Sequence, residues 1–196
     1  AIASGLVSIK SAFILSLVYF SLSFIIGLSI NIFFGFILFL YFLVQILYCF
    51  KLKHVPIIEF FCIASGFILR SVAGGVASNI FISSWFLLSV GMLSLFLALE
   101  KRKAEIVNLR NSKLNTRKVF KSYSLTLINK FEAVLTSSTI MTYSLWAYGP
   151  SIGGSKSPLM IITIPLVMLG IFRYQMLSEI KQNRILKKYN INLETQ

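Results

Sequence analysis

The hydrophobic pattern of the chain predicts membrane-spanning helices. Residues 11–50 form forty consecutive positions without a formal charge. At about 1.5 Å per helical residue, this stretch is roughly twice as long as a span across a 30 Å hydrocarbon layer, so it must fold back once. A turn around residues 27–31 gives two expected spans. The six spans predicted in this way are residues 11–28, 32–50, 57–77, 81–99, 122–148 and 158–177.

The composition agrees with lipid as the solvent of these segments. Hydrophobic residues make up 57% of the chain and charged residues 13%, whereas soluble domains are about 45–50% apolar and about 25% charged. We therefore expect an all-α fold, a polytopic transmembrane helical bundle, with residues 1–196 forming a single transmembrane domain. The net charge of +13 would favour nucleic acid in a soluble protein, but here it describes the connections between spans, and no nucleic-acid partner is expected.

The basic residues predict the topology of the bundle. Fifteen of the nineteen lysines and arginines fall on one side of the expected spans, and only Lys156 lies in a connection on the other side. The positive-inside rule then places the basic connections and both termini in the cytoplasm, with the protein in the cell (inner) membrane. The fifteen are Lys10, Lys51, Lys53, the eight basic residues of 101–121, Lys181, Arg184, Lys187 and Lys188.

Ionisable residues inside the expected spans are candidates for function or for pairing between helices, because each costs about 2.5–3.5 kcal/mol to insert. They are Glu59, Arg70, Lys130, Glu132 and Arg173. At 100° per residue, Glu59 and Arg70 share one small and polar face of the third span with Gly66, Ala73 and Ala77. That face indicates either pairing between helices or substrate binding.

Two further polar stripes follow the same helical spacing. In the fifth span the stripe consists of Glu132, Thr136, Thr139 and Tyr143; in the second span it consists of Tyr41, Gln45 and Tyr48 and leads to Lys51 and Lys53. Since most of the buried charges fall in the cytoplasmic halves of their spans, we expect a cavity that opens to the cytoplasm. The two cysteines, Cys49 and Cys62, have no disulfide or metal spacing and are expected to pack.

Three segments carry a resemblance to a known family. They are residues 48–77, which include Lys51-Leu-Lys-His and Leu69-Arg-Ser-Val-Ala-Gly; Leu99-Glu-Lys-Arg-Lys-Ala-Glu105; and Ile164-Pro with Gly170-Ile-Phe-Arg-Tyr174. Together they resemble the UbiA superfamily of membrane prenyltransferases, and more narrowly its decaprenyl-phosphate phosphoribosyltransferase branch. The resemblance covers nearly the whole chain.

The resemblance implies a larger bundle with a metal site. Members have about nine helices, and an Asp-rich motif on the second helix holds Mg²⁺ on the diphosphate. Residues 1–5 are similar to the end of the segment that follows this motif, so the six spans are expected to be helices three to eight, without the first two and the ninth. All six acidic residues are glutamates, so the resemblance implies Mg²⁺ as cofactor but no metal site in this chain, and inactivity of the chain alone.

The function implied by the resemblance is transfer of 5-phosphoribosyl from phosphoribosyl diphosphate to a polyprenyl phosphate. The donor 5-phosphate and the lipid phosphate both favour extra cationic groups, and Lys101 and Arg102 stand where other family members carry carboxylates. Which carboxylate is catalytic stays open. The candidate substrate-binding residues are Tyr48, Lys51, Lys53, Glu59, Arg70, Glu100, Lys101, Arg102, Glu105, Lys130 and Arg173.

Three alternatives remain at this point. An aromatic polyprenyltransferase of the same superfamily would use two Asp motifs, which the basic sequence at residues 100–105 argues against. A transporter would use the buried charges as its substrate path and would be supported by inverted repeats, which the sequence does not display. The third alternative is an inactive gene fragment. For residues 101–121 alone, the alternative to a binding role is that the basic residues serve only as a topology signal.

Overall fold

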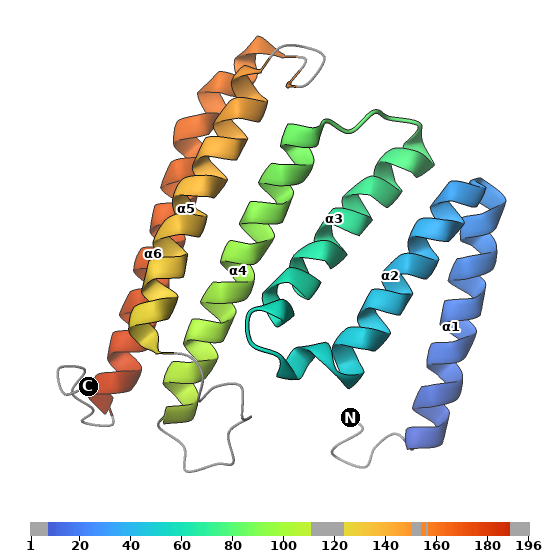
Figure 1. The fold of residues 1–196 in the computed structure, drawn as a ribbon, viewed down its shortest axis with the longest axis horizontal. Helices are drawn as coiled ribbons and strands as arrows, with labels where there is room; N and C mark the ends of the chain where they lie inside the picture. Colours follow the sequence, from blue (N-terminus) through green and yellow to red (C-terminus); the bar gives the residue numbers. More distant parts are fainter. Residues whose placement is uncertain (1–7, 111–123, 150–153, 156, 189–196) are drawn as a thin grey trace.

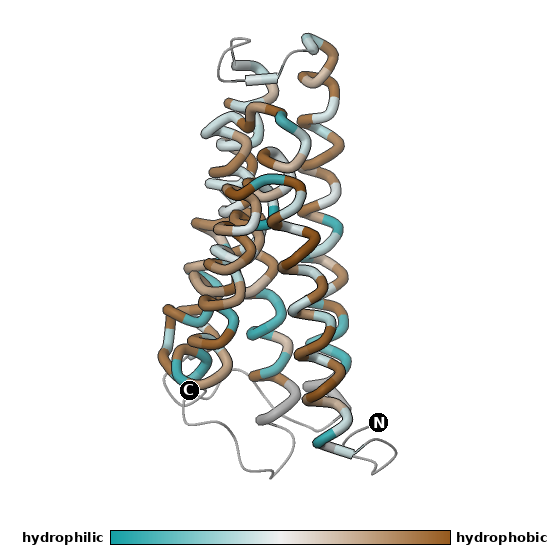
Figure 2. The backbone as a smooth tube through the Cα atoms, turned by 90° about the vertical axis from the view of Figure 1, so that its right-hand side faces the viewer, coloured by the Kyte–Doolittle hydropathy of each residue, from teal (hydrophilic) through white to brown (hydrophobic). Residues whose placement is uncertain are grey.

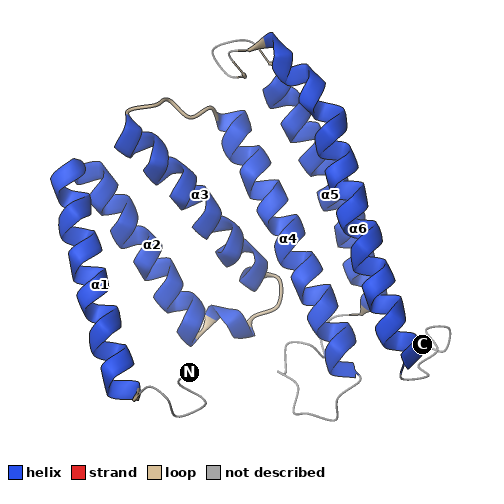
Figure 3. Cartoon of the chain, turned by 180° about the vertical axis from the view of Figure 1, so that it is seen from behind, coloured by secondary structure: helices blue, strands red, loops and turns tan. Residues whose placement is uncertain are grey.

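The computed structural model describes residues 8–110, 124–149, 154, 155 and 157–188, and within these ranges it contains helices and no strand. The helices run in chain order through the bundle (Figures 1 and 3). They are α1 (Ile9–Ile30), α2 (Ile32–Phe50), the 3₁₀ helix η1 (Leu52–His54), α3 (Ile58–Ser78), α4 (Ser84–Arg110), α5 (Leu125–Tyr148), the 3₁₀ helix η3 (Pro158–Ile162) and α6 (Thr163–Lys188). The expected all-α bundle is confirmed.

The turn between α1 and α2 lies where the sequence predicts it. Asn31 leaves the helical conformation with extended backbone, and its side-chain oxygen accepts a hydrogen bond from the Phe33 N–H at 2.9 Å, which caps α2. Gly35 allows the two helices to approach closely, because a Cβ atom there would lie 2.4 Å from Leu28 Cδ2. The long apolar run therefore folds into a helical hairpin.

The helices form a row in which α4 lies between α3 on one side and α5 with α6 on the other (Figure 1). The buried core sits in the middle of this row, where α3, α4 and α5 meet, and consists of Phe60, Ala98, Leu99, Ile106 and Ile128. By contrast, α1 and α2 expose most of their large apolar side chains. Such a surface suits lipid or another apolar partner, because in water it would be a large exposed hydrophobic patch.

Five of the described helices are long and apolar enough to cross a membrane. The qualifying segments are Lys10–Ile30, Ile32–Phe50, Ile58–Ser78, Ser84–Val107 and Pro158–Arg184. Helix α5 is not among them; it carries Lys130 and Glu132 together with three buried threonines. Glu132 and Thr136 contact side chains of neighbouring helices, whereas the hydroxyls of Thr139 and Thr142 donate to carbonyl oxygens of α5 itself.

The predicted ends of the fourth and sixth spans are wrong. Helix α4 does not end near Leu99 but continues to Arg110, so residues 100–105 are helical and not part of a loop. Lysine, arginine, glutamate and alanine are good helix formers, which explains the extension in a segment without glycine or proline. The sixth expected span begins with the 3₁₀ helix η3, and α6 follows it. Helix α6 continues beyond Leu177 and ends at Lys188. Residues 111–123 lie outside the described residues.

One end of the bundle is rich in charge. The start of α1, the η1 segment, the end of α4, the start of α5 and the end of α6 lie at this end (Figure 1). Coloured by hydropathy, the chain has most of its hydrophilic positions toward the same end (Figure 2). We call it the basic end, since Lys10, Lys51, Lys53 and the lysines and arginine of 101–103 lie there.

Candidate functional site

The candidate site is built on the last turns of α4, residues 100–105. Successive residues of a helix point about 100° apart, so the short charged run contacts several neighbours at once. Arg102 turns toward α3, Lys103 toward α5 and Glu100 toward α6. Lys101 faces a cavity beside α2 and α3. Extension of α4 beyond Leu99 is what makes this distribution possible.

Arg102 lies in a buried ion-pair cluster with two carboxylates. Its guanidinium donates to Glu59 Oε2 on α3 and, at 2.5 Å, to Glu105 Oε2 one turn along α4. The side chains of Arg102 and Glu59 are only 7% and 1% exposed, while that of Glu105 is 38% exposed. The sequence left open whether Glu59 pairs between helices or binds substrate, and the geometry shows the pairing.

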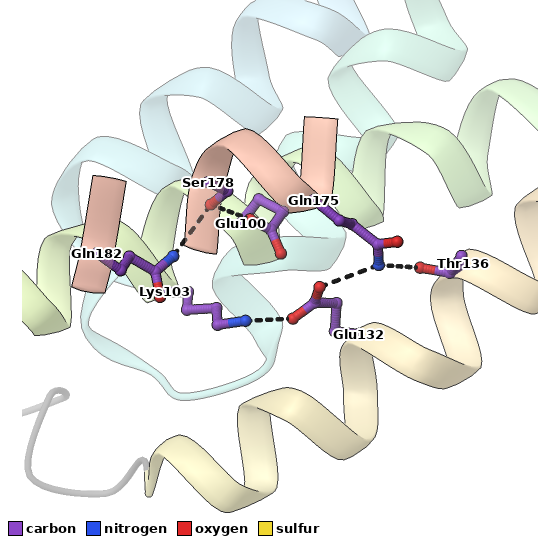
Figure 4. Close-up of polar contacts among 7 residues, drawn as sticks. All are labelled: Glu100, Lys103, Glu132, Thr136, Gln175, Ser178 and Gln182. Carbon is purple, nitrogen blue, oxygen red and sulfur yellow. Dashed lines mark hydrogen bonds and ion pairs between the residues drawn. The ribbon is translucent and has the colours of Figure 1, made fainter. Parts of the chain in front are cut away.

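A second polar cluster joins α4, α5 and α6 (Figure 4). Lys103 Nζ donates to Glu132 Oε2 at 2.6 Å, and the Gln175 amide donates to Glu132 Oε1 at 3.0 Å and to Thr136 Oγ1 at 2.8 Å. Both partners of the ion pair are less than 10% exposed. This confirms the inward orientation expected for Glu132 and Thr136.

Glu100 extends the same cluster toward α6. Its Oε2 accepts a hydrogen bond from Ser178 Oγ at 2.6 Å, and Ser178 in turn accepts one from the Gln182 amide at 3.0 Å. Figure 4 shows the Glu100 carboxylate directed toward the Lys103 and Glu132 pair. The side chain is almost fully buried. Helix α6 is therefore fixed to α4 by polar contacts at the basic end.

Lys101, unlike its neighbours, lines a cavity. The cavity has a volume of about 400 Å³ and lies between α2, α3 and α4. Its polar lining consists of Lys101, Arg70, Tyr48, Gln45 and Ser94. Lys101 and Arg70, which lie on different helices, are thus brought to one cavity together with a phenol and an amide. These groups can donate hydrogen bonds to an anionic ligand.

The remaining candidates lie elsewhere. Lys51 is the exposed C-cap residue that follows α2, and Lys53 lies half-buried in η1. Lys130 is exposed on α5. Arg173 is exposed on α6, where it lines a separate and largely apolar groove with Pro165 and Phe172 among its neighbours. Neither Lys130 nor Arg173 takes part in the two buried clusters or in the cavity of Lys101.

The sequence did not identify four residues of the buried clusters as candidates: Lys103, Gln175, Ser178 and Gln182. A signal existed for Lys103, because it stands within the charged run at residues 100–105. Because the sequence analysis placed these residues in a loop, it could not predict that the Lys103 side chain points toward α5. For the other three, the sequence offers only ordinary polar side chains near the end of the last apolar segment and in the polar residues that follow it.

The described carboxylates do not fit a Mg²⁺ site. Mg²⁺ favours several oxygen ligands in octahedral geometry, and the described ranges contain no group of three histidine, cysteine, aspartate or glutamate residues that could hold a metal ion. Glu59 and Glu132 already accept hydrogen bonds from Arg102 and Lys103. No chemical step is therefore assigned to a metal at these residues.

The family follows from comparison with known proteins. A family model described as the UbiA prenyltransferase family matches residues 1–193. The chain belongs to this family. Membership agrees with the helical bundle and with several apolar helices that are long enough to span a membrane. It supports a transferase rather than a transporter.

Several curated relatives share one name, decaprenyl-phosphate phosphoribosyltransferase. The protein of Corynebacterium glutamicum is 35% identical over 75% of this chain and 45% of its own length. The protein of Mycolicibacterium smegmatis is 37% identical over 55% of this chain and 34% of its own length. That of Mycobacterium tuberculosis is 34% identical over 68% of this chain and 44% of its own length. The chain spans less than half the length of these relatives.

Proposed function

We propose that the protein carrying this chain is a membrane transferase that moves 5-phosphoribosyl from phosphoribosyl diphosphate to a polyprenyl phosphate. The proposal rests on the shared name of the UbiA relatives and on one observation in the fold. That observation is the cavity in which Lys101 and Arg70 meet with Tyr48. Two cations at one cavity suit substrates that carry several phosphate groups.

The proposed reaction is a displacement at the anomeric carbon of the ribose. An oxygen of the lipid phosphate forms the new bond to that carbon, the bond from the carbon to the diphosphate oxygen breaks, and diphosphate leaves. Negative charge grows on the leaving group, so fixed cations and hydrogen-bond donors stabilise the transition state. Mg²⁺ on the diphosphate stays part of the proposal, although the described carboxylates do not supply its site.

Within this proposal Lys101 and Arg102 have different roles. Lys101 has an exposed side chain at the cavity and is free to contact a phosphate. Arg102 is buried against Glu59 and Glu105, so its charge is compensated by carboxylates of the protein itself. We infer that Lys101 binds substrate and that Arg102 holds α3 and α4 together.

The test compares Lys101→Met with Lys181→Met in the gene product that carries this chain. Lys181 is a matched control, because it is an exposed lysine on α6 near the same end. Loss of a charge-assisted hydrogen bond costs about 1.5–3 kcal/mol, so Lys101→Met should weaken the apparent donor affinity about tenfold or more. Lys181→Met should leave it unchanged. The measurement is phosphoribosyl transfer to a polyprenyl phosphate, corrected for the amount of inserted protein.

A second donor identifies the phosphate that Lys101 binds. If it is the 5-phosphate, Lys101→Met should penalise phosphoribosyl diphosphate much more than ribosyl diphosphate without the 5-phosphate. Equal penalties would assign Lys101 to the diphosphate or the lipid phosphate, and unchanged kinetics with both donors would leave it as a topology signal. Prenyl transfer to an aromatic acid without phosphoribosyl transfer would instead favour the aromatic prenyltransferase.

We also propose that the basic end faces the cytoplasm and that the protein lies in the cell inner membrane. The basis is the positive-inside rule together with the basic end of the bundle. His54 and Ile80 are exposed residues near opposite ends of α3. In a cysteine-free background, His54→Cys should resist an impermeant thiol reagent in intact cells and Ile80→Cys should react. The reverse pattern would contradict the orientation, and labelling at both would contradict the span.

A further inference from the structure

The carboxyl group of Glu100 is buried and has one unsatisfied oxygen. The residue is 2% exposed. Its Oε2 accepts the hydrogen bond from Ser178, whereas its Oε1 is buried and has no hydrogen-bond partner within the described residues. A buried acceptor without a donor is costly, and native structures rarely leave one. The free oxygen therefore requires a partner that the ionised side chains around it do not supply.

The charges next to Glu100 do not balance. Its carboxyl group is directed toward Glu132, and the two groups interact (Figure 4). Glu132 is also buried, at 7% exposure. Lys103 donates to Glu132 and is, within the described ranges, the one cation that forms an ion pair with either carboxyl. Two buried carboxyl groups thus share a single ammonium.

The other elements that pack here add no compensating charge. Helix α6 contributes only uncharged groups to the cluster, from Gln175, Ser178 and Gln182. The remaining charged side chains at this end of the described helices either form the separate Arg102 cluster or are exposed. They are Glu59, Arg102 and Glu105 in that cluster, and Lys101, Lys130, Glu179 and Lys181 on the exposed surface.

We propose that Glu100 is a neutral acid at neutral pH and that it shares its proton with Glu132. The Oε1 hydroxyl donates to the Glu132 carboxylate, while Oε2 still accepts from Ser178. Two buried carboxyl groups that face each other do not readily hold two charges, so one keeps a proton. The proton supplies the missing donor and leaves one carboxylate opposite one ammonium. A proton also fits better than a metal ion, because the described ranges hold no group of three candidate metal ligands.

The shared proton helps to attach α6 at the basic end. Only two described residues of α6 are buried, Ile171 and Gln182, so apolar packing holds this helix weakly. Its polar contacts converge on the carboxyl pair, since Ser178 donates to Glu100 and Gln175 donates to Glu132. With the proton in place, both carboxyl groups accept from α6 at once. Without it, two like charges would face each other between α4 and α5.

Infrared difference spectroscopy tests the proton directly, because the C=O stretch of a protonated carboxyl group lies apart from the bands of carboxylates and amides. The gene product that carries this chain is measured in lipid nanodiscs at neutral pH, in light and heavy water. The parent should show an isotope-sensitive carboxyl band that Glu100→Gln loses. Glu179→Gln is the matched control, because Glu179 is an exposed carboxyl on α6, and it should keep the band.

Two outcomes of this measurement would overturn the proposal. The first is a spectrum of the parent without the band, which would mean that a buried water satisfies the free oxygen of an ionised Glu100. The second is a band that persists in Glu100→Gln.

Glu132→Gln tests whether the proton is shared. This variant leaves Glu100 as the single carboxyl group beside Lys103, so Glu100 should ionise and the band should disappear. A band that persists in Glu132→Gln would show that burial alone keeps Glu100 neutral, and it would overturn the shared proton.

Hydrogen exchange of the backbone amides tests the attachment of α6. Glutamine can accept from Ser178 and donate to Glu132 as the neutral acid does, so Glu100→Gln should exchange like the parent. Glu100→Leu removes both hydrogen bonds and should speed exchange in the last turns of α6 about fivefold or more, the scale of one lost hydrogen bond. Equal exchange in the leucine variant and the parent would overturn the attachment, and equally fast exchange in both variants would overturn the neutral acid. None of these measurements needs turnover, so their outcome is independent of the proposed function.

Discussion

Arg102 offers the sharpest prediction about the charged turn of α4, because its neighbour Lys101 serves as a control. Arg102→Met removes the guanidinium and leaves the Glu59 carboxylate in a site where its side chain is 1% exposed. Breaking a buried ion pair by removing one partner costs about 3–5 kcal/mol. The partly exposed contact with Glu105 adds less than about 1 kcal/mol. Lys101→Met should change the free energy of unfolding by less than about 0.5 kcal/mol, because it removes an exposed charge.

The assay is reversible unfolding of the purified protein in mixed micelles with rising denaturing detergent, followed by helical circular dichroism. Glu59→Gln completes a double-mutant cycle, since glutamine leaves no charge to be stranded. In that background Arg102→Met should cost at least about 1 kcal/mol less than it does in the parent. A cost near zero for Arg102→Met, or the same cost in both backgrounds, would refute a buried ion pair between α3 and α4.

Two further predictions concern the packing around this turn. Lys103→Met should destabilise the protein by about 3–5 kcal/mol, because it leaves the buried Glu132 carboxylate without its cation. Adding Glu132→Gln to this variant should restore part of the lost stability. If the same unfolding assay shows no restoration, the ion pair between Lys103 and Glu132 is contradicted. Gly75→Ala should cost about 1–3 kcal/mol, because the new methyl group would lie 2.4 Å from the Ile82 side chain. Gly74→Ala next to it meets nothing within 4 Å and should be neutral or slightly stabilising; a reversed order of these two variants would contradict the packing of α3.

The apolar spans could be predicted from the sequence because their signal is local. Residues 11–50 must fold back for reasons of length alone, and Asn31 supplies the cap at the place where they do. The inward stripe of Glu132 and Thr136 was also readable, since helical spacing fixes which residues share a face. The end of α4 was not, because charged residues are equally compatible with a loop and a helix until partners on other helices are known.

The separation of the intramembrane charges has a simple explanation in hindsight. Lys130 precedes Glu132 by two residues, which is about 200° around a helix, so burial of Glu132 leaves Lys130 on the exposed side of α5. Arg173 and Gln175 on α6 stand in the same relation, and it is Gln175 that reaches Glu132. Helical geometry therefore prevents both residues of each pair, Lys130 with Glu132 and Arg173 with Gln175, from facing the same site. The sequence alone does not say which of the two faces inward. That choice depends on the neighbouring helices.

The charged turn of α4 combines helix packing with the proposed binding role of Lys101 in four consecutive residues. Because each residue is rotated by about 100° from the last, Glu100 contacts α6, Arg102 contacts α3 and Lys103 contacts α5. These three contacts fix the rotation of α4 about its own axis, and that rotation directs Lys101 into the cavity it shares with Arg70. A buried ion pair adds little net stability compared with apolar residues of the same shape. Its value here is geometric: an apolar turn could fill the same space, but it would not hold the lysine at a defined position beside the proposed phosphate groups.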